Sequence, residues 1–193
     1  MLNGKKILLI IGGGIAAFKC HDLIRGLREA GASVTPVLTE AGKEFVTPLS
    51  ISVLSGSKVY ADLFDLEDET QMGHIELSRN SDLIVIVPAT ADLLAKMASG
   101  LANDLASTLL LATDTEVLAA PAMNVRMWEH LATRRNIQLL KKDGISFIGP
   151  VEGSMACGEF GFGRMAEPEQ IIIAIKKKLS LGKLKGKHIV VTS

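Results

Sequence analysis

The chain has 193 residues, enough for one medium-sized domain with a sizeable buried core. Lys and Arg together number 21, as do Asp and Glu, so the formal net charge is zero and neither nucleic acid nor an acidic membrane is expected as a partner. No run of about 18 apolar residues is present that could cross a bilayer. Cys20 and Cys157 form no disulfide framework, which favours a cytoplasmic location.

The first predicted element is a buried strand over residues 6–11, a continuous apolar run that ends at three glycines. A second strand is predicted at residues 33–38. Similar apolar runs occupy residues 83–87, 116–120 and 145–148, and they stop at Pro88, at Pro121 and before Gly149-Pro150. Such runs are typical of strands that are covered on both faces.

Helical patterns separate the strands. The first pattern ends near Gly31 and puts one apolar stripe on Ala16, Cys20, Leu23, Ile24 and Leu27, so Cys20 is expected to be an inert core residue. The other patterns cover residues 91–97, 105–112, 127–142 and 168–179. Strands that alternate with helices predict a Rossmann-like, doubly wound parallel sheet in a three-layer α/β/α arrangement.

Two segments do not follow this alternation of strands and helices. Residues 152–164 contain Gly153, Gly158, Gly161 and Gly163 and show neither a helical nor a strand period, so a mobile loop or flap is predicted there. Residues 187–193 look like a new strand that stops abruptly. We therefore expect a main domain over residues 1–181, followed in residues 182–193 by a linker and the first strand of a further domain.

The glycines of Gly12–Ala17 lie between a strand and a helix, where backbone amides can hold a phosphate. The pattern fits a dinucleotide fingerprint, but a glycine turn without a ligand explains it equally well. At the end of the second strand, Thr39 suits a monophosphate and Glu40 suits a ribose diol. The residues alone leave these alternatives open.

Two more segments follow buried strands at the edge where α/β proteins bind ligands. In residues 88–92, Thr90 and Asp92 could contact a ligand or could simply begin a helix. In residues 121–128, Asn124 has the same two interpretations, and the methionines beside it could be core filler.

His74 and Cys157 are candidate proton-transfer residues. Histidine's ordinary pKa, about 6.5, suits a general base, although a lone histidine is more often structural. Cys157 lies among the flap glycines, where packing does not explain it. Its thiol could donate a proton, act as a nucleophile, or be incidental. No His, Cys or carboxylate stands at metal-ligand spacing, so no metal site is expected.

Taken together, these segments resemble the flavin-dependent cysteine decarboxylase family, and most closely the phosphopantothenoylcysteine decarboxylases of bacterial coenzyme A synthesis. The resemblance covers nearly the whole chain. It rests on Gly13-Gly14-Ile15-Ala16-Ala17, His74, Pro88-Ala89-Thr90-Ala91-Asp92, Pro121-Ala122-Met123-Asn124 with Met127, and Ala156-Cys157-Gly158 through Gly163-Arg164-Met165. The family's commonest form has Asn where this chain has Asp92, and the Asp form resembles the bifunctional bacterial subgroup.

The resemblance implies decarboxylation of 4′-phospho-N-pantothenoylcysteine to 4′-phosphopantetheine. FMN would oxidise the substrate to a thioaldehyde, carbon dioxide would leave, and reduced flavin would return the electrons to the enethiol. By the same resemblance, His74 would be the base, Asn124 would hold the carboxylate, and Cys157 would protonate the enethiolate as the flap closes.

The resemblance also implies contacts and partners. FMN would contact Gly13, Gly14, Ile15, Thr39, Thr90, Ala91, Asp92, Leu93 and Ala122, and the substrate would contact Asn124, Met123 and Ala156. Family members place the flavin between the subunits of a trimer, and bacterial members assemble trimers into a dodecamer, so a homo-oligomer is implied. Residues 182–193 resemble the opening of a fused phosphopantothenate-cysteine ligase domain, downstream of the FMN-dependent decarboxylase domain.

Three related activities remain alternatives: a peptidyl-cysteine decarboxylase, a flavin prenyltransferase and a non-catalytic regulatory binding protein. His74 and Cys157 argue against prenyl transfer, and together with Asn124 they argue against a purely regulatory role. A nicotinamide dehydrogenase is a more distant alternative, which an absorbance spectrum would separate from any flavoprotein.

Overall fold

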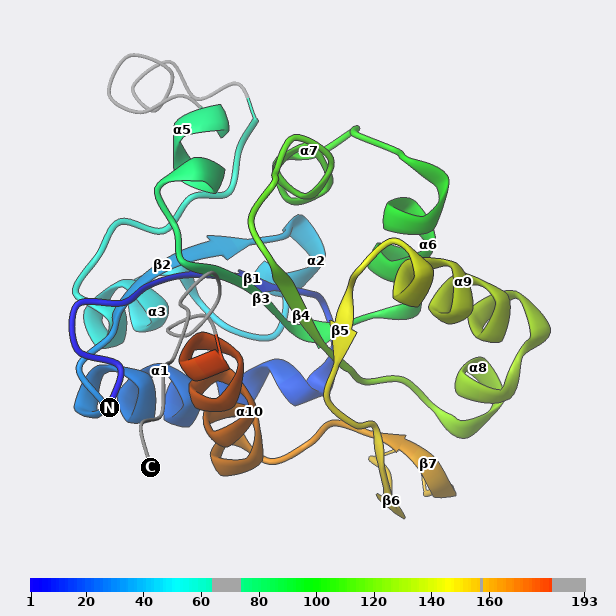
Figure 1. Cartoon of the computed structure of the whole chain (residues 1–193). Coiled ribbons are helices and arrows are strands. Elements are labelled where there is room, and N and C mark those ends of the chain that lie inside the picture. The colour runs from blue at the N-terminus through cyan, green and yellow to red at the C-terminus, as the bar shows by residue number, and fades with distance from the viewer. Residues whose placement is uncertain (64–73, 157, 182–193) are drawn as a thin grey trace, which may run out of the picture.

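A computed structural model describes residues 1–63, 74–156 and 158–181, with only the backbone described at His74, Ile75 and Leu181. Its centre is a five-stranded parallel sheet in the order β2-β1-β3-β4-β5 (Figure 1). The strands are β1 (Lys6–Ile11), β2 (Ser33–Leu38), β3 (Leu83–Ala89), β4 (Val117–Pro121) and β5 (Ser146–Phe147). The chain proceeds outward from β1 first to one side and then to the other, so the predicted doubly wound fold is confirmed.

Alternate residues of each central strand pack into different cores. In β1, Ile7, Leu9 and Ile11 face one core, and Leu8 and Ile10 face the other. The first core is covered by α1 (Cys20–Glu29), α3 (Pro48–Ser55) and α10 (Pro168–Leu181). The second is covered by α5 (His74–Arg79), α6 (Ala91–Ser99), α7 (Leu105–Leu111) and α9 (Leu131–Lys142). The helices therefore lie in layers on both sides of the sheet (Figure 1).

Several helices differ from the expected ranges. A 3-10 helix (Ile15–Lys19) precedes α1, and α2 (Glu40–Lys43) and α3 were not singled out from the sequence. The single helix expected over residues 127–142 is two, α8 (Val125–Glu129) and α9, because His130 is extended at ψ 137° and caps α9 through its side chain. Within the described ranges, no helix is long and apolar enough to span a membrane.

β3 runs through the proline that was expected to end it, whereas β4 ends at Pro121, as expected, with the proline as its last residue. β3 continues to Ala89, and Ala89 pairs with Pro121 of β4. Proline lacks an N–H donor, so the ladder shifts its register between Ile86 and Ala89 instead of stopping.

The prediction of an irregular segment over residues 152–164 is wrong for most of its length. β6 (Val151–Ser154) and β7 (Phe160–Arg164) form an antiparallel hairpin there (Figure 1). Its glycines allow close packing: a Cβ on Gly163 would lie 2.3 Å from the carbonyl oxygen of Met123. The Met123 N–H donates to the Gly163 carbonyl at 3.0 Å, so the hairpin lies directly against the segment that follows β4.

We expect Gly163→Ala to destabilise the protein more than Gly144→Ala. Both glycines have positive φ, 144° and 93°, but a Cβ on Gly144 would meet nothing within 4 Å. The control, Gly144→Ala, should therefore lower the free energy of unfolding by about 1 kcal/mol through backbone strain alone. Gly163→Ala should lower it by roughly a further 1–3 kcal/mol, because the added Cβ overpacks the contact with Met123. Urea unfolding measures both, and equal losses would contradict the close approach.

Candidate functional site

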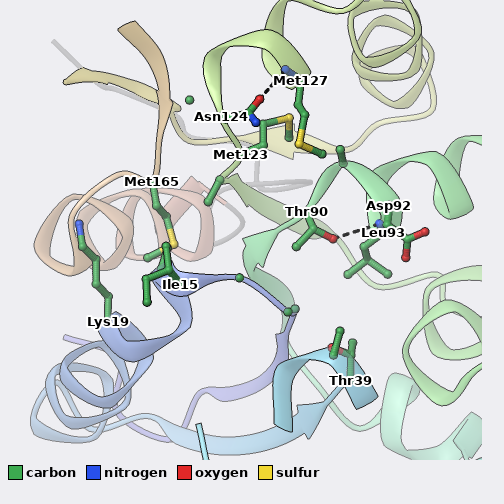
Figure 2. Close-up of a pocket in the computed structure, with 18 of the residues that line it drawn as sticks. Ile15, Lys19, Thr39, Thr90, Asp92, Leu93, Met123, Asn124, Met127 and Met165 are labelled. Atoms are coloured by element: carbon green, nitrogen blue, oxygen red, sulfur yellow. Dashed lines mark hydrogen bonds between the residues drawn. The ribbon is translucent and has the colours of Figure 1, made fainter. Parts of the chain in front are cut away.

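A large pocket opens at the carboxyl edge of the sheet. Its volume is about 1090 Å³, and it is lined by the segments that follow four adjacent parallel strands (Figure 2). Gly12–Gly14 follow β1, Thr39 follows β2, Thr90 follows β3, and Ala122–Asn124 follow β4. Parallel strands end at the same edge, and the change of direction between β1 and β3 separates their loops, which creates the crevice.

The three glycines after β1 have different surroundings. A Cβ on Gly12 would lie 2.4 Å from the carbonyl oxygen of Pro88, and one on Gly13 would lie 2.3 Å from Cβ of Ala41. A Cβ on Gly14 would meet only Pro88 and Thr90, at 3.9 and 4.0 Å. The first two glycines therefore serve the packing of the chain itself, and the third leaves space open at the pocket. The helix that follows is a short 3-10 helix, unlike the α-helix of a dinucleotide fingerprint.

Polar side chains at the strand ends cap the helices that begin there. Thr39 Oγ1 accepts from the Gly42 N–H at 3.1 Å, and Thr90 Oγ1 accepts from the Leu93 N–H at 3.2 Å. The capping interpretation of Thr90 is therefore correct. Asp92 does not cap α6, and its side chain is 76% exposed in the first turn. These caps turn helix N-termini toward the pocket.

Asn124 also caps its helix, and its side chain keeps one further group that can form a hydrogen bond. Its Oδ1 accepts from the Met127 N–H at 2.8 Å. The amide Nδ2 therefore remains a donor, and Asn124 lies on the pocket wall (Figure 2). Capping and ligand binding are compatible for this residue.

One cluster of charges lies on the pocket wall at α6 and α7. Lys96 Nζ is 2.8 Å from Asp104 Oδ2 and 3.4 Å from Asp92 Oδ2. The hydrogen bond to Asp104 raises the pKa of Lys96. Burial alone would raise the pKa of Asp104, but hydrogen bonds from Lys96 and Ser107 outweigh it and lower that pKa. Lys96 is therefore a cation between two carboxylates.

A second cluster joins the 3-10 helix to the chain after β7. Glu167 accepts from Lys19 Nζ at 2.8 and 2.9 Å and also contacts Arg164. Chiefly because of the hydrogen bond from Lys19, the pKa of Glu167 lies below its ordinary value. Lys19 and Arg164 both line the pocket, so this cluster joins opposite parts of its wall.

Much of the remaining wall is apolar. Ile15, Met123, Met127, Met155 and Met165 line the pocket. Unbranched methionine side chains adapt to a flat apolar ligand, and Met123 and Met127 stand with Ile15 and Met165 around the cavity in Figure 2.

The structure brings almost all of the candidate site residues to this one pocket. Its lining includes Gly13, Gly14, Ile15, Thr39, Thr90, Ala91, Asp92, Leu93, Ala122, Met123, Asn124 and Ala156. Cys157 lies outside the described residues, between the described Ala156 and Gly158. His74 begins α5, but its side chain is not among those described.

Cys20 is a core residue, as expected. It is fully buried, its thiol donates to the Val87 carbonyl oxygen at 3.0 Å, and burial raises the pKa of the thiol well above its ordinary value. A thiol held protonated in this way is inert.

Sequence reasoning missed the charged residues of the pocket wall. Lys96 follows Asp92 by four residues on a predicted helix, a spacing that could have indicated an ion pair. Lys19 and Asp104 gave no such local signal, because Lys19 pairs with the distant Glu167 and Asp104 pairs with Lys96 of another helix.

The chain was compared with known proteins. The coenzyme A biosynthesis bifunctional protein CoaBC of Vibrio vulnificus is 50% identical over 192 residues, which cover 100% of this chain and 48% of that protein. The chain thus spans about half the length of the curated relatives it matches.

Solved structures of related proteins are also similar to this chain. A PPC decarboxylase, a cysteine-to-serine mutant complexed with pantothenoylaminoethenethiol, is 33% identical with a TM-score of 0.82 over 91% of this chain and 98% of that one. The FMN binding protein AtHal3 is 32% identical with a TM-score of 0.79 over 95% and 99%. The Flavoprotein family model matches residues 1–180. With that match and these relatives, the chain belongs to the Flavoprotein family.

Proposed function

We propose that this chain binds FMN and decarboxylates 4′-phospho-N-pantothenoylcysteine to 4′-phosphopantetheine. The observation that carries the proposal is the single pocket into which the strand-end segments 12–15, 90–93 and 122–124 converge. The similarity to a coenzyme A biosynthesis protein and to a PPC decarboxylase supports this substrate. The similarity to an FMN binding protein supports this cofactor.

The residues of the pocket fit a flavin. Space is open in front of Gly14, and Ile15 with the methionines offers an apolar surface to a flat ring. A volume of about 1090 Å³ lies just above the usual range for one ligand, roughly 300–1,000 Å³, and suits a cofactor with a substrate beside it. Bound FMN would supply the two-electron oxidation and reduction that the decarboxylation requires.

Asn124 is suited to hold the substrate carboxylate. The Met127 N–H occupies its Oδ1 and so fixes the orientation of the side-chain amide. Nδ2 is then the group free to donate to an anion in the pocket, and the helix N-terminus behind it adds a favourable dipole.

Proton transfers are assigned to His74 and Cys157. We assign to His74 the acceptance of a proton during substrate oxidation, and to Cys157 the donation of one during reduction of the enethiol. Met155 and Ala156 line the pocket, which supports a role at this site for the residue that follows them in sequence. The enethiol carried by the PPC decarboxylase cysteine-to-serine mutant fits such a role for a cysteine.

We also propose a homo-oligomer, a trimer or an assembly of trimers, in a protein with a fused ligase domain. Large apolar side chains remain exposed around the pocket mouth and α3: Ile15, Phe18, Leu49 and Val53 are 54–74% exposed. A second copy could cover them. The chain matches only 48% of the length of its bifunctional relative, which supports a fused ligase domain whose first strand lies within residues 182–193.

The direct test is incubation with FMN and 4′-phospho-N-pantothenoylcysteine. We expect a yellow protein and 4′-phosphopantetheine, followed by absorbance and mass spectrometry. Cys157→Ser should stop at the enethiol, because an alcohol is a far weaker proton donor than a thiol. A yellow protein that turns over only a peptide ending in cysteine would contradict the substrate. A protein that cannot be loaded with FMN would contradict the whole proposal.

Gly14→Val is expected to weaken FMN binding by about tenfold or more, because its side chain would fill the space that we assign to the flavin. Backbone φ at Gly14 is −174°, which any residue adopts, so the thermal unfolding of the FMN-free protein should change little. Titration of flavin fluorescence measures affinity. Unchanged FMN affinity would place the cofactor elsewhere.

Asn124→Asp separates capping from carboxylate binding. The carboxylate still accepts from the Met127 N–H, so stability and FMN affinity should persist. The donor to the substrate is replaced by a like charge, so kcat/KM should fall on the order of 10²-fold or more. Asn124→Ser is the control that keeps a helix cap and replaces the amide donor with a shorter hydroxyl, without adding charge. Activity of Asn124→Asp equal to wild type would contradict the assigned contact.

A further inference from the structure

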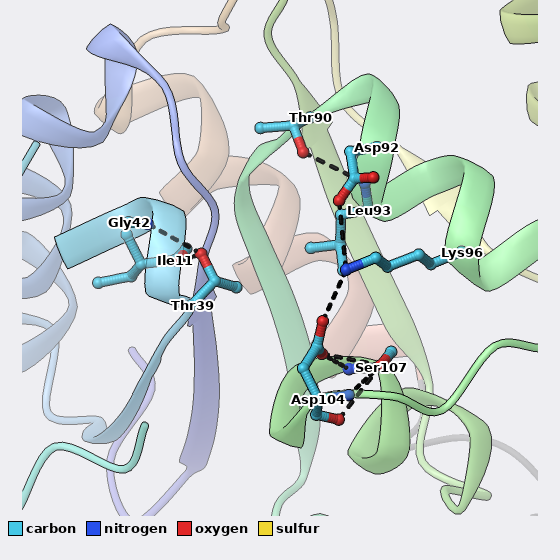
Figure 3. A network of polar contacts seen from close by, with 9 residues as sticks. All are labelled: Ile11, Thr39, Gly42, Thr90, Asp92, Leu93, Lys96, Asp104 and Ser107. Atoms are coloured by element: carbon cyan, nitrogen blue, oxygen red, sulfur yellow. Dashed lines mark hydrogen bonds and ion pairs between the residues drawn. The ribbon is translucent and has the colours of Figure 1, made fainter. Parts of the chain in front are cut away.

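Lys96 links two helices at the edge of the pocket. It extends from α6 between Asp92 of the same helix and Asp104 at the start of α7, with Nζ 3.4 Å and 2.8 Å from the two carboxylates (Figure 3). Its side chain is 22% exposed, compared with 76% for Asp92 and 34% for Asp104. All three residues line the cavity, so the arrangement belongs to the pocket wall.

Asp104 is the fixed partner in this group. Its Oδ1 accepts from the Ser107 N–H and the Ser107 hydroxyl, both at 2.7 Å, in the capping box of α7. Its other oxygen is left for Lys96, which is thereby held in place. Asp92 has no comparable support, and its position depends on Lys96.

The N-terminus of α6 also faces the pocket. The Thr90 side chain caps only the Leu93 amide, and the first turn of a helix attracts anions. Asp92, in that same turn, is an anion of the protein itself and would compete with any bound anion. Lys96 lies four residues on, and this i,i+4 pairing draws the carboxylate along the helix and offsets its charge.

We propose that Lys96 is a positioning residue that keeps the Asp92 carboxylate away from the N-terminus of α6, so that this end of the pocket accepts the phosphate of FMN. The inference rests on the proposed FMN site and deepens it. With Lys96 the three side chains carry a net charge of one negative unit, and without it two. Filling the pocket removes water from Asp92, which strengthens its repulsion of a dianionic phosphate.

The proposal distinguishes phosphorylated from unphosphorylated flavin. Riboflavin has the same ring and ribityl chain as FMN but no phosphate, so a lost positive charge at Lys96 should affect it little. If the phosphate instead lay at Lys19 and Arg164, removal of Lys96 would not discriminate between the two flavins.

The experiment is a fluorescence titration of the whole chain with FMN and with riboflavin. Lys96→Met should weaken FMN binding by about tenfold or more and riboflavin binding by less than about threefold. Adding Asp92→Asn to Lys96→Met should restore FMN affinity to within about threefold of wild type, because the repelling charge is gone. Lys96→Arg should retain most of the affinity.

Lys178→Met is the matched control. Lys178 is 19% exposed, lies 3.5 Å from Glu116 and donates to Ser146, but does not line the pocket. The Lys178→Met variant should bind FMN and riboflavin with unchanged affinity. Thermal unfolding of each variant measures how much the loss of its ion pair destabilises the protein. If Lys96→Met does not fold, Lys96→Gln takes its place, because it removes the same positive charge and should weaken FMN binding more than riboflavin binding in the same way.

Equal weakening of FMN and riboflavin by Lys96→Met, or no rescue by Asp92→Asn, would overturn the inference. So would a tenfold loss of FMN affinity in Asp92→Asn alone. These outcomes all presuppose a wild-type chain that binds FMN. A wild type that binds neither flavin would instead reject the proposed function.

Discussion

Backbone hydrogen bonds join β1 to β2 on one side and to β3 on the other, and all three strands point the same way. Because of this parallel pairing, the loops after β1, β2, β3 and β4 leave the sheet at one edge. Each loop then begins a helix, and in three of these helices Thr39, Thr90 or Asn124 accepts a hydrogen bond from one amide of the first turn. The pocket is therefore a consequence of strand direction and of helix capping together.

Opposite charges around the pocket are paired within small groups of residues. Lys96 stands between Asp92 and Asp104, and Glu167 contacts both Lys19 and Arg164. In the first group the Asp104 carboxylate, fixed in a capping box, holds the longer Lys96 side chain in one place. The wall can thus present charges to a ligand without a large rearrangement on binding.

The glycine-rich hairpin shows why composition alone gave a wrong prediction for residues 152–164. Gly153, Gly161 and Gly163 predict mobility when only the local sequence is considered. In the structure they lie in β6 and β7, and Gly163 permits a backbone approach to Met123 that no Cβ would allow. These glycines allow the hairpin to pack against a surface that is distant in sequence. No local sequence pattern could therefore have predicted the hairpin. His130, which divides α8 from α9, is a similar case on a smaller scale.

The sequence by itself determined the order of the five parallel strands and of most helices between them, the two-sided core and the segments that form the pocket. Those features depend on hydrophobic period and on glycine and proline at element ends, which are local properties. Tertiary structure alone decided the charge pairs of Lys19, Lys96, Asp104 and Glu167, the hairpin, and the use of Asn124 as a cap with a free amide donor. These depend on which distant side chains and backbone groups meet after folding, and that is set by the packing of the layers.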